Sequence, residues 1–167
     1  MIYNVKGTLT YTDPTFAVVD CGGVGFKCYI SMTTLRELPS IGTEVNLYTY
    51  MSVREDALDL FGFYDIDELE AFKLLISVSG IGPKAAIAIL SVLTPEKLSV
   101  AVSSGDIRSI QSAQGVGKKT AERVVLELKD KMAGIGGAST AVQNAQSVAS
   151  STDAQEAVEV LVSLGFN

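Results

Sequence analysis

Short runs of β-branched and aromatic residues, separated by Gly, Pro and Asp, dominate residues 1–63. Runs of this length, bounded by turn residues, are typical of β-strands. The expected strands cover residues 2–11, 16–21, 24–30, 45–53 and 58–63, and a short helix is expected over residues 33–38. Five short strands with one small helix predict a small closed β-barrel.

A helical pattern replaces the strand pattern after residue 64, with apolar residues recurring every three or four positions. Capping residues mark the expected helix boundaries: Asp65 or Asp67 before the first helix, Thr94-Pro95 before a later one, and Gly105-Asp106 between that helix and a short one. The last helix is expected over residues 118–132. Residues 85–93 are apolar nearly all round, so we expect their helix at the buried centre of this domain.

Residues 133–152 contain no charged side chain and are rich in Gly, Ala, Ser and Thr, which predicts a flexible linker. Beyond it, Asp153 and Glu156 form a capping box ahead of an amphipathic helix. A single short amphipathic helix cannot bury its apolar face, so residues 153–167 are expected to begin a further helical domain that is incomplete here. The predicted class is therefore α+β and multidomain.

A closed five-stranded barrel with one small helix is the architecture of the OB-fold. Barrels of this type often stack single-stranded bases on aromatic side chains. Trp is absent from this chain, and most Tyr and Phe residues fall at strand positions that a core would occupy. The sequence therefore favours a packing role for these rings over a base-stacking role.

Two segments 35 residues apart repeat one pattern: residues 80–86 read GIGPKAA and residues 115–121 read GVGKKTA. Self-similarity at a fixed offset predicts one supersecondary unit used twice. In each copy two glycines precede an expected helix, and a lysine lies two residues after the second glycine, at Lys84 and Lys119.

This repeated unit has the chemistry of a phosphate site. A glycine turn lets a ligand approach the backbone closely, and a helix start offers unpaired N–H groups and the positive end of the helix dipole. Lysine there has the wrong sign for the dipole, so its presence twice favours a bound anion over a solvated helix start. We expect both units to contact nucleic-acid backbone without reading bases.

Two nucleotide-binding motifs are alternatives for these segments. GIGPKA fits the dinucleotide fingerprint, with Asp106 as the ribose carboxylate, if the preceding LLISV is a strand. The helical spacing before the first glycine favours the phosphate-clamp interpretation. The ATP-binding loop suggested by GVGKKT fails, because Ser112 stands where its first glycine belongs and Lys119 follows Lys118.

The charge distribution is uneven. The chain has a net charge of −6, which is unusual for a protein that binds nucleic acid. Residues 108–131, however, hold six lysine and arginine residues against three acids. A local positive field suits a phosphate clamp, and an acidic remainder would discourage non-specific coating of DNA.

The cysteine and histidine content excludes one class of metal site. Cys21 and Cys28 make no disulfide framework, and the absence of His excludes a Cys/His zinc site. We expect two small buried cysteines on neighbouring strands in a reducing cytosol, with no cofactor. No apolar run is long enough for a membrane span or a signal peptide, so we expect a cytoplasmic protein without membrane contacts.

An acidic loop separates the last two expected strands, where VREDA places Glu55 and Asp56 at a hairpin tip. Acids are common in solvated turns, and this is the simpler interpretation. Alternatively, two adjacent carboxylates among phosphates would repel them and favour strand separation at one place.

The VREDA hairpin, DLFGFYDIDELEAFKLLISVSGIGPKAAIAIL and GVGKKTAERVVLELKDKM together resemble the RuvA family of bacterial Holliday-junction-binding proteins. The resemblance covers residues 1 to about 132. It implies an OB-fold domain (1–63), a tandem helix-hairpin-helix domain (64–132), a linker (133–152) and the start of a UBA-like helical domain (153–167). The family has three helices in that last domain, whereas this sequence stops after EAVEVLVSLGFN, which puts motor binding in doubt.

The resemblance also assigns residues and partners. The DNA phosphate-binding set would be Gly80, Ile81, Gly82, Lys84, Gly115, Val116, Gly117, Lys118, Lys119 and Arg123. Glu55 and Asp56 would form an acidic pin at the crossover. The implied partners are four-way junction DNA, three further copies in a homotetramer or seven in an octamer on DNA, the hexameric ATPase RuvB, and the junction resolvase RuvC.

We predict a non-catalytic protein that recognises four-way junctions by shape and backbone, and the resemblance implies that it holds them open and square-planar. No nucleophile–base pair or catalytic carboxylate pair is evident, so the ATPase would reside in the partner. The alternative is a helix-hairpin-helix fragment of a repair glycosylase or nuclease, for which Asp130 is a loose candidate.

Overall fold

A computed structural model of the chain describes residues 1–129 and 131. Residues Met1–Leu128 form one compact unit. The linker expected over residues 133–152 and the helix expected over residues 153–167 lie outside the described residues.

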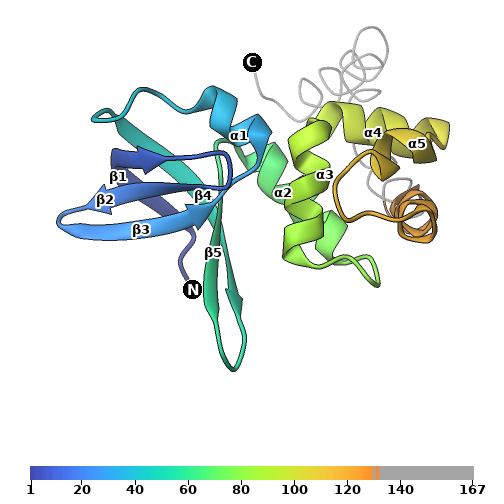
Figure 1. Cartoon of the computed structure of the whole chain (residues 1–167), viewed down its shortest axis with the longest axis horizontal. Helices are drawn as coiled ribbons and strands as arrows, with labels where there is room; N and C mark the ends of the chain where they lie inside the picture. Colours follow the sequence, from blue (N-terminus) through green and yellow to red (C-terminus); the bar gives the residue numbers. More distant parts are fainter. Residues whose placement is uncertain (130, 132–167) are drawn as a thin grey trace, which may run out of the picture. The chain divides into compact units, whose positions relative to one another are not determined.

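The N-terminal part is a closed barrel in which the strands follow the order β1-β2-β3-β5-β4. The pairs are antiparallel, except that β3 and β5 run parallel. Figure 1 shows the barrel with its one short helix, and the expected five strands and helix are confirmed. The elements are β1 (Asn4–Thr12), β2 (Phe16–Cys21), β3 (Val24–Tyr29), α1 (Met32–Glu37), β4 (Glu44–Val53) and β5 (Leu58–Phe63).

The barrel core is filled by aliphatic side chains, among them the fully buried Leu9, Val19 and Leu47. Cys28 is also buried there, and burial raises the pKa of its thiol to about 12, so this cysteine is an inert packing residue. Both cysteines are free, but Cys21, on the neighbouring strand, is only half-buried, so the expected burial holds for Cys28 alone.

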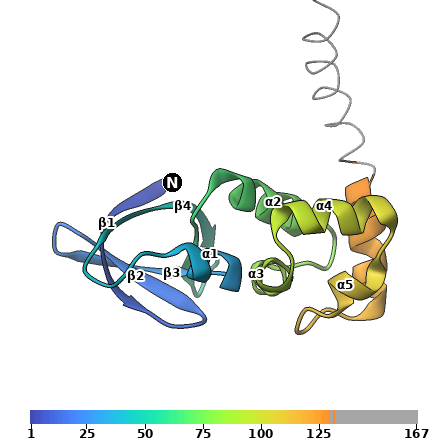
Figure 2. The same ribbon diagram turned by 90° about the horizontal axis from the view of Figure 1, so that it is seen from above.

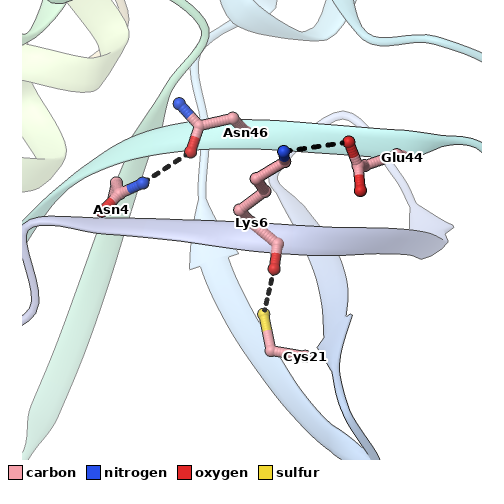
Figure 3. Close-up of polar contacts among 5 residues, drawn as sticks. All are labelled: Asn4, Lys6, Cys21, Glu44 and Asn46. Atoms are coloured by element: carbon pink, nitrogen blue, oxygen red, sulfur yellow. Dashed lines mark hydrogen bonds and ion pairs between the residues drawn. The ribbon is translucent and has the colours of Figure 1, made fainter.

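Polar contacts on the outer face hold β1 to its neighbours (Figure 3). Lys6 forms an ion pair with Glu44 on β4 at 3.2 Å, and the Cys21 thiol on β2 donates to the Lys6 carbonyl at 3.2 Å. Next to this contact, a Cβ added at Gly7 would lie 2.0 Å from the Asp20 carbonyl oxygen, so β1 and β2 can approach this closely only with glycine there.

The C-terminal part of the compact unit is helical. It contains α2 (Ile66–Ile76), α3 (Pro83–Val92), α4 (Pro95–Ser104) and α5 (Ile107–Gln111), followed by a helix over residues 118–129. Asp65, not Asp67, caps α2, and the other predicted caps are confirmed: Thr94 begins α4, Gly105 ends it at φ +73°, and Asp106 begins α5. Among the described residues no single helix could span a membrane, although α3 and α4, bent by 93°, meet the length and composition criteria together.

The helix α3, expected at the buried centre of this domain, is buried on one face only. Ala86, Ile89 and Leu90 are buried, whereas Val92 is 46% exposed. The other face lines a groove of about 650 Å³, whose barrel side includes Tyr29 and Phe61. This side of α3 is therefore partly exposed, along a groove that it lines together with residues of the barrel.

Candidate nucleic-acid interface

The two glycine segments adopt the same backbone hydrogen bonding, 35 residues apart. The Ile81 N–H donates to the Val78 carbonyl at 3.1 Å, and the Val116 N–H donates to the Ala113 carbonyl at 3.1 Å. Each helix then begins with the same bond, from Ala86 to Gly82 at 3.0 Å and from Ala121 to Gly117 at 2.9 Å. The sequence repeat is thus a repeat of structure, and we call each copy a glycine corner: residues 79–84 and 114–119.

Glycine is required at the first position of each corner, because Gly80 has φ +89° and Gly115 has φ +79°. The second glycines serve a different purpose. Gly82 and Gly117 are exposed, and a Cβ added at either would meet no atom within 4 Å. The space directly before each helix is therefore open to a ligand.

The helices at the corners also differ from their neighbours in capping. Four other helices are capped: at the start of each, the side chain of the N-cap residue accepts a hydrogen bond from a backbone N–H group of the first turn. The caps are Ser31 for α1, Asp65 for α2, Thr94 for α4 and Asp106 for α5. In contrast, α3 begins at Gly82 with no side-chain cap, and Gly117 has no side chain with which to cap the helix that follows. Pro83, the first residue of α3, has no N–H group, so α3 offers the N–H groups of Lys84 and Ala85 with the positive end of its dipole, and the second helix offers those of its own first turn.

Ile81 and Val116 anchor the corners. Both side chains are 6% exposed, and both N–H groups are engaged within the chain. Neither residue thus offers an N–H group to an anion. Any contribution of Ile81 and Val116 to phosphate binding would be indirect, through the shape of the turn that they stabilise. The phosphate contact predicted for them stays a prediction.

Lysines surround both openings. Lys84, Lys118 and Lys119 are exposed, and Lys118 is 3.8 Å from Glu122, one turn further along the same helix. In the described part of the chain neither Lys84 nor Lys119 has an ion-pair partner. These two cations are therefore available to an external anion.

Arg123 occupies a place that sequence reasoning did not foresee. Its guanidinium donates to the Ser79 carbonyl at 3.1 Å, so it reaches from the second hairpin to the first glycine corner. Its Nε lies 4.0 Å from Glu127. The phosphate contact predicted for Arg123 stays a prediction, but the structure shows Arg123, on the helix that follows the second corner, in contact with the first corner. A contact between residues 44 positions apart leaves no periodic signal in the sequence.

The acidic loop lies at the tip of the β4–β5 hairpin, which extends past the other strands of the barrel in Figure 1. Glu55 and Asp56 are exposed there, and the Arg54 N–H closes the turn onto the Ala57 carbonyl at 2.8 Å. The Arg54 guanidinium binds Asp59 on β5 at 2.5 Å. The neighbouring cation is thus directed back onto the strand, and the two tip carboxylates face solvent.

The structure contradicts the dinucleotide alternative. A helix, α2, precedes the first corner where the fingerprint needs a strand. Asp106 caps α5, where hydrogen bonds from Ser109 lower the pKa of its carboxyl, so it is not a free ribose ligand. Within residues 1–129 and 131 no group of three or more acids and cysteines could hold a metal. Asp130, the candidate for a glycosylase, lies outside the described residues.

Family models and curated relatives match both the barrel and the helical part of this chain. A family model for the RuvA N terminal domain matches residues 1–62, and one for a SAM-like helix-hairpin-helix tandem matches residues 72–130. A protein of Desulforamulus reducens named Holliday junction branch migration complex subunit RuvA is 44% identical over 167 residues, which is 100% of this chain and 82% of that relative. The chain belongs to the RuvA family.

Other RuvA relatives match a shorter stretch. The protein of Acetivibrio thermocellus, with the same name, is 46% identical over 132 residues, which is 79% of this chain and 65% of that relative. The Lachnospira eligens RuvA is 40% identical over 174 residues and 84% of its length. The resemblance predicted from VREDA and the two glycine segments is thereby confirmed, as is the barrel followed by a helix-hairpin-helix domain.

Proposed function

We propose that this chain is a non-catalytic DNA-binding subunit that recognises four-way junctions by their shape and phosphate backbone. The observation that carries this proposal is the pair of glycine corners: two helix N-termini without side-chain caps, on one compact unit, each beside lysines. The printed name of the relatives, a subunit of the Holliday junction branch migration complex, supports the same function.

Each corner would hold a phosphate by hydrogen bonds from the first N–H groups of its helix, with Lys84 or Lys119 as a mobile cation. These donors address oxygens that are the same at every nucleotide, so binding would carry no sequence information. Arg123 ties the helix that follows the second corner to the first corner, so the two corners would hold two phosphates at a fixed separation. That separation selects a backbone geometry rather than a base sequence.

The acidic loop would repel phosphates, whereas the glycine corners would bind them. A carboxylate about 4 Å from a phosphate is repelled by about 1 kcal/mol in water and about 4 kcal/mol near a protein surface. Glu55 and Asp56 at the point where four strands cross would therefore keep phosphates apart there. Strands held by the corners and repelled at the centre favour an open, square-planar junction.

A four-armed ligand suits a protein with several copies of the same grip. We infer a homotetramer, or an octamer on DNA, that presents its acidic loops at the crossover and recruits the hexameric ATPase RuvB, with the resolvase RuvC acting on the same junction. We infer that this activity takes place in the bacterial cytoplasm, where junction DNA would be found. The segment expected to recruit the motor, residues 153–167, lies outside the described residues.

A gel-shift competition between a four-way junction and a linear duplex of equal length tests the proposal. We expect the junction to bind more tightly, and affinity for both DNAs to fall steeply with salt because phosphate contacts release counterions. Equal affinity for the two DNAs, or a flat salt response, would contradict the proposal. Cleaved or abasic product from labelled junction would favour the glycosylase or nuclease alternative instead.

A further inference from the structure

Glu68, in α2, is the only charged residue with a fully buried side chain in the described part of the protein. It belongs neither to the glycine corners nor to the acidic loop. Burial raises the pKa of its carboxyl, and hydrogen bonds from the Ser31 and Thr34 hydroxyls act in the opposite direction. A buried acid is costly unless its oxygens are satisfied, so its contacts show what it holds in place.

Both oxygens of Glu68 accept from the first turn of α1. Ser31, the N-cap of α1, donates its hydroxyl to Oε1, and Thr34 donates its hydroxyl to Oε2 at 2.6 Å. The same hydroxyls accept backbone N–H groups, Ser31 from Thr34 at 2.9 Å and Thr34 from Tyr64 at 3.0 Å. Each hydroxyl therefore has one donor and one acceptor partner, and the pattern is complete when Glu68 is ionised.

The first turn of α1 is also bound to α3. The Thr33 hydroxyl donates to the Leu90 carbonyl at 2.6 Å, and the Met32 N–H donates to the Ser91 hydroxyl at 3.1 Å. We call these contacts, with those of Glu68, the α1 joint. Figures 1 and 2 both show α1 on the side of the barrel that faces the helices.

The joint connects the two parts of the proposed site. The helix α3 begins at the first glycine corner. The helix α2 follows β5, the strand that comes directly after the acidic loop in the chain. Since α1 binds α2 through Glu68 and α3 through Thr33, it fixes the corner relative to the barrel that carries the loop. The Phe72 ring of α2, which packs on Phe61 and Phe63 of β5, supports the same connection.

We propose that Glu68 is a positioning residue that holds the acidic loop in register with the glycine corners and so sets how far this protein opens the crossover of a bound junction. This inference rests on the proposed function. Holding a DNA arm needs only the glycine corners, whereas opening the crossover needs the corners and the acidic loop in register. Loosening the α1 joint should therefore reduce strand separation at the crossover and leave DNA affinity nearly unchanged.

Two variants test the joint, and a third serves as a matched control. Glu68→Gln keeps the shape but removes the charge and one acceptor oxygen. Thr33→Val removes only the hydrogen bond to the Leu90 carbonyl, so it still tests the joint if Glu68→Gln does not fold. Glu70→Gln makes the same charge change on the same helix at an exposed position, where Glu70 pairs only with Lys73.

Dissociation constants for a junction and a duplex are measured for each folded variant, together with the fluorescence of a base analogue at the crossover. For Glu68→Gln and Thr33→Val we expect weaker crossover fluorescence at saturating protein, with junction and duplex affinity both within about twofold of the unchanged chain. Glu70→Gln should change neither fluorescence nor affinity. Unchanged crossover fluorescence in both joint variants, or a loss of affinity on both DNAs, would overturn the role of Glu68. A lack of selectivity in the unchanged chain would instead overturn the proposed function.

Discussion

Filling the open space before α3 or before the helix over residues 118–129 with a carboxylate should stabilise the folded protein but weaken its binding to DNA. Gly82→Asp and Gly117→Asp each place a carboxylate over the N–H groups that are proposed to hold phosphate. Gly82 has φ −90° and ψ 170°, values that any residue adopts, and an added Cβ at either glycine meets no atom within 4 Å. Neither strain nor collision should therefore obscure the result.

The new carboxylate should stabilise the folded protein. Aspartate in place of glycine at an N-cap contributes a few tenths of a kcal/mol, and its charge at the dipole adds about 0.3–1 kcal/mol. Each variant should therefore gain about 0.5–1 kcal/mol, which for a unit of this size raises the Tm by about 2–6 °C.

The same carboxylate should weaken DNA binding, because it occupies the phosphate site. The variant loses charge-assisted hydrogen bonds, which contribute about 1.5–3 kcal/mol each, and gains a like-charge contact of about 1–4 kcal/mol at 4 Å. Since 1.4 kcal/mol is a factor of ten, the junction Kd should rise at least about tenfold.

Thermal unfolding and fluorescence anisotropy with a labelled junction measure the two effects. Thr94→Asp is the control, because it adds the same charge at the cap of α4, outside the corners. We expect this variant to bind DNA nearly as the unchanged chain does. Variants of Gly82 or Gly117 that become more stable but bind junctions as tightly as before would refute the assignment of these helix ends to phosphate.

Three further predictions concern the clamp, the loop and the barrel. Lys119→Ala should weaken binding to junctions of every sequence alike and reduce the salt slope by about one, measured by anisotropy at several salt concentrations; a sequence-dependent loss would contradict this. Replacing Glu55 by Gln and Asp56 by Asn should leave or raise junction affinity while reducing base-analogue fluorescence at the crossover; weaker binding would mean an ordinary structural turn. Gly62→Ala should destabilise the barrel by about 1–3 kcal/mol in urea unfolding, because its Cβ would lie 2.9 Å from the Cys28 Cβ, and unchanged stability would show that the barrel relaxes.

The strands, the helix caps and the glycine corners could all be predicted from the sequence because each depends on neighbouring residues. β2 and β5 have the predicted bounds, and Thr94 and Asp106 cap the helices that follow them. The role of Arg123 and the burial of Glu68 could not be predicted, because both depend on partners 34 to 44 residues away. The exposed face of α3 was missed for the same reason: its surroundings are set by the barrel, not by its own apolar sequence.

If the corners hold phosphate as proposed, the capping pattern also explains how an acidic protein would bind DNA selectively. Every helix start is an anion site unless the chain fills it, and Ser31, Asp65, Thr94 and Asp106 fill four of those in the described residues with their own oxygens. Only the glycine-led starts at the two corners are left open, and the lysines stand there. With a net charge of −6 over the whole chain, the remaining surface repels a phosphate backbone that approaches elsewhere. Attraction confined to two fixed points within a repelling field selects DNA by geometry, whereas a uniformly basic surface would bind any duplex.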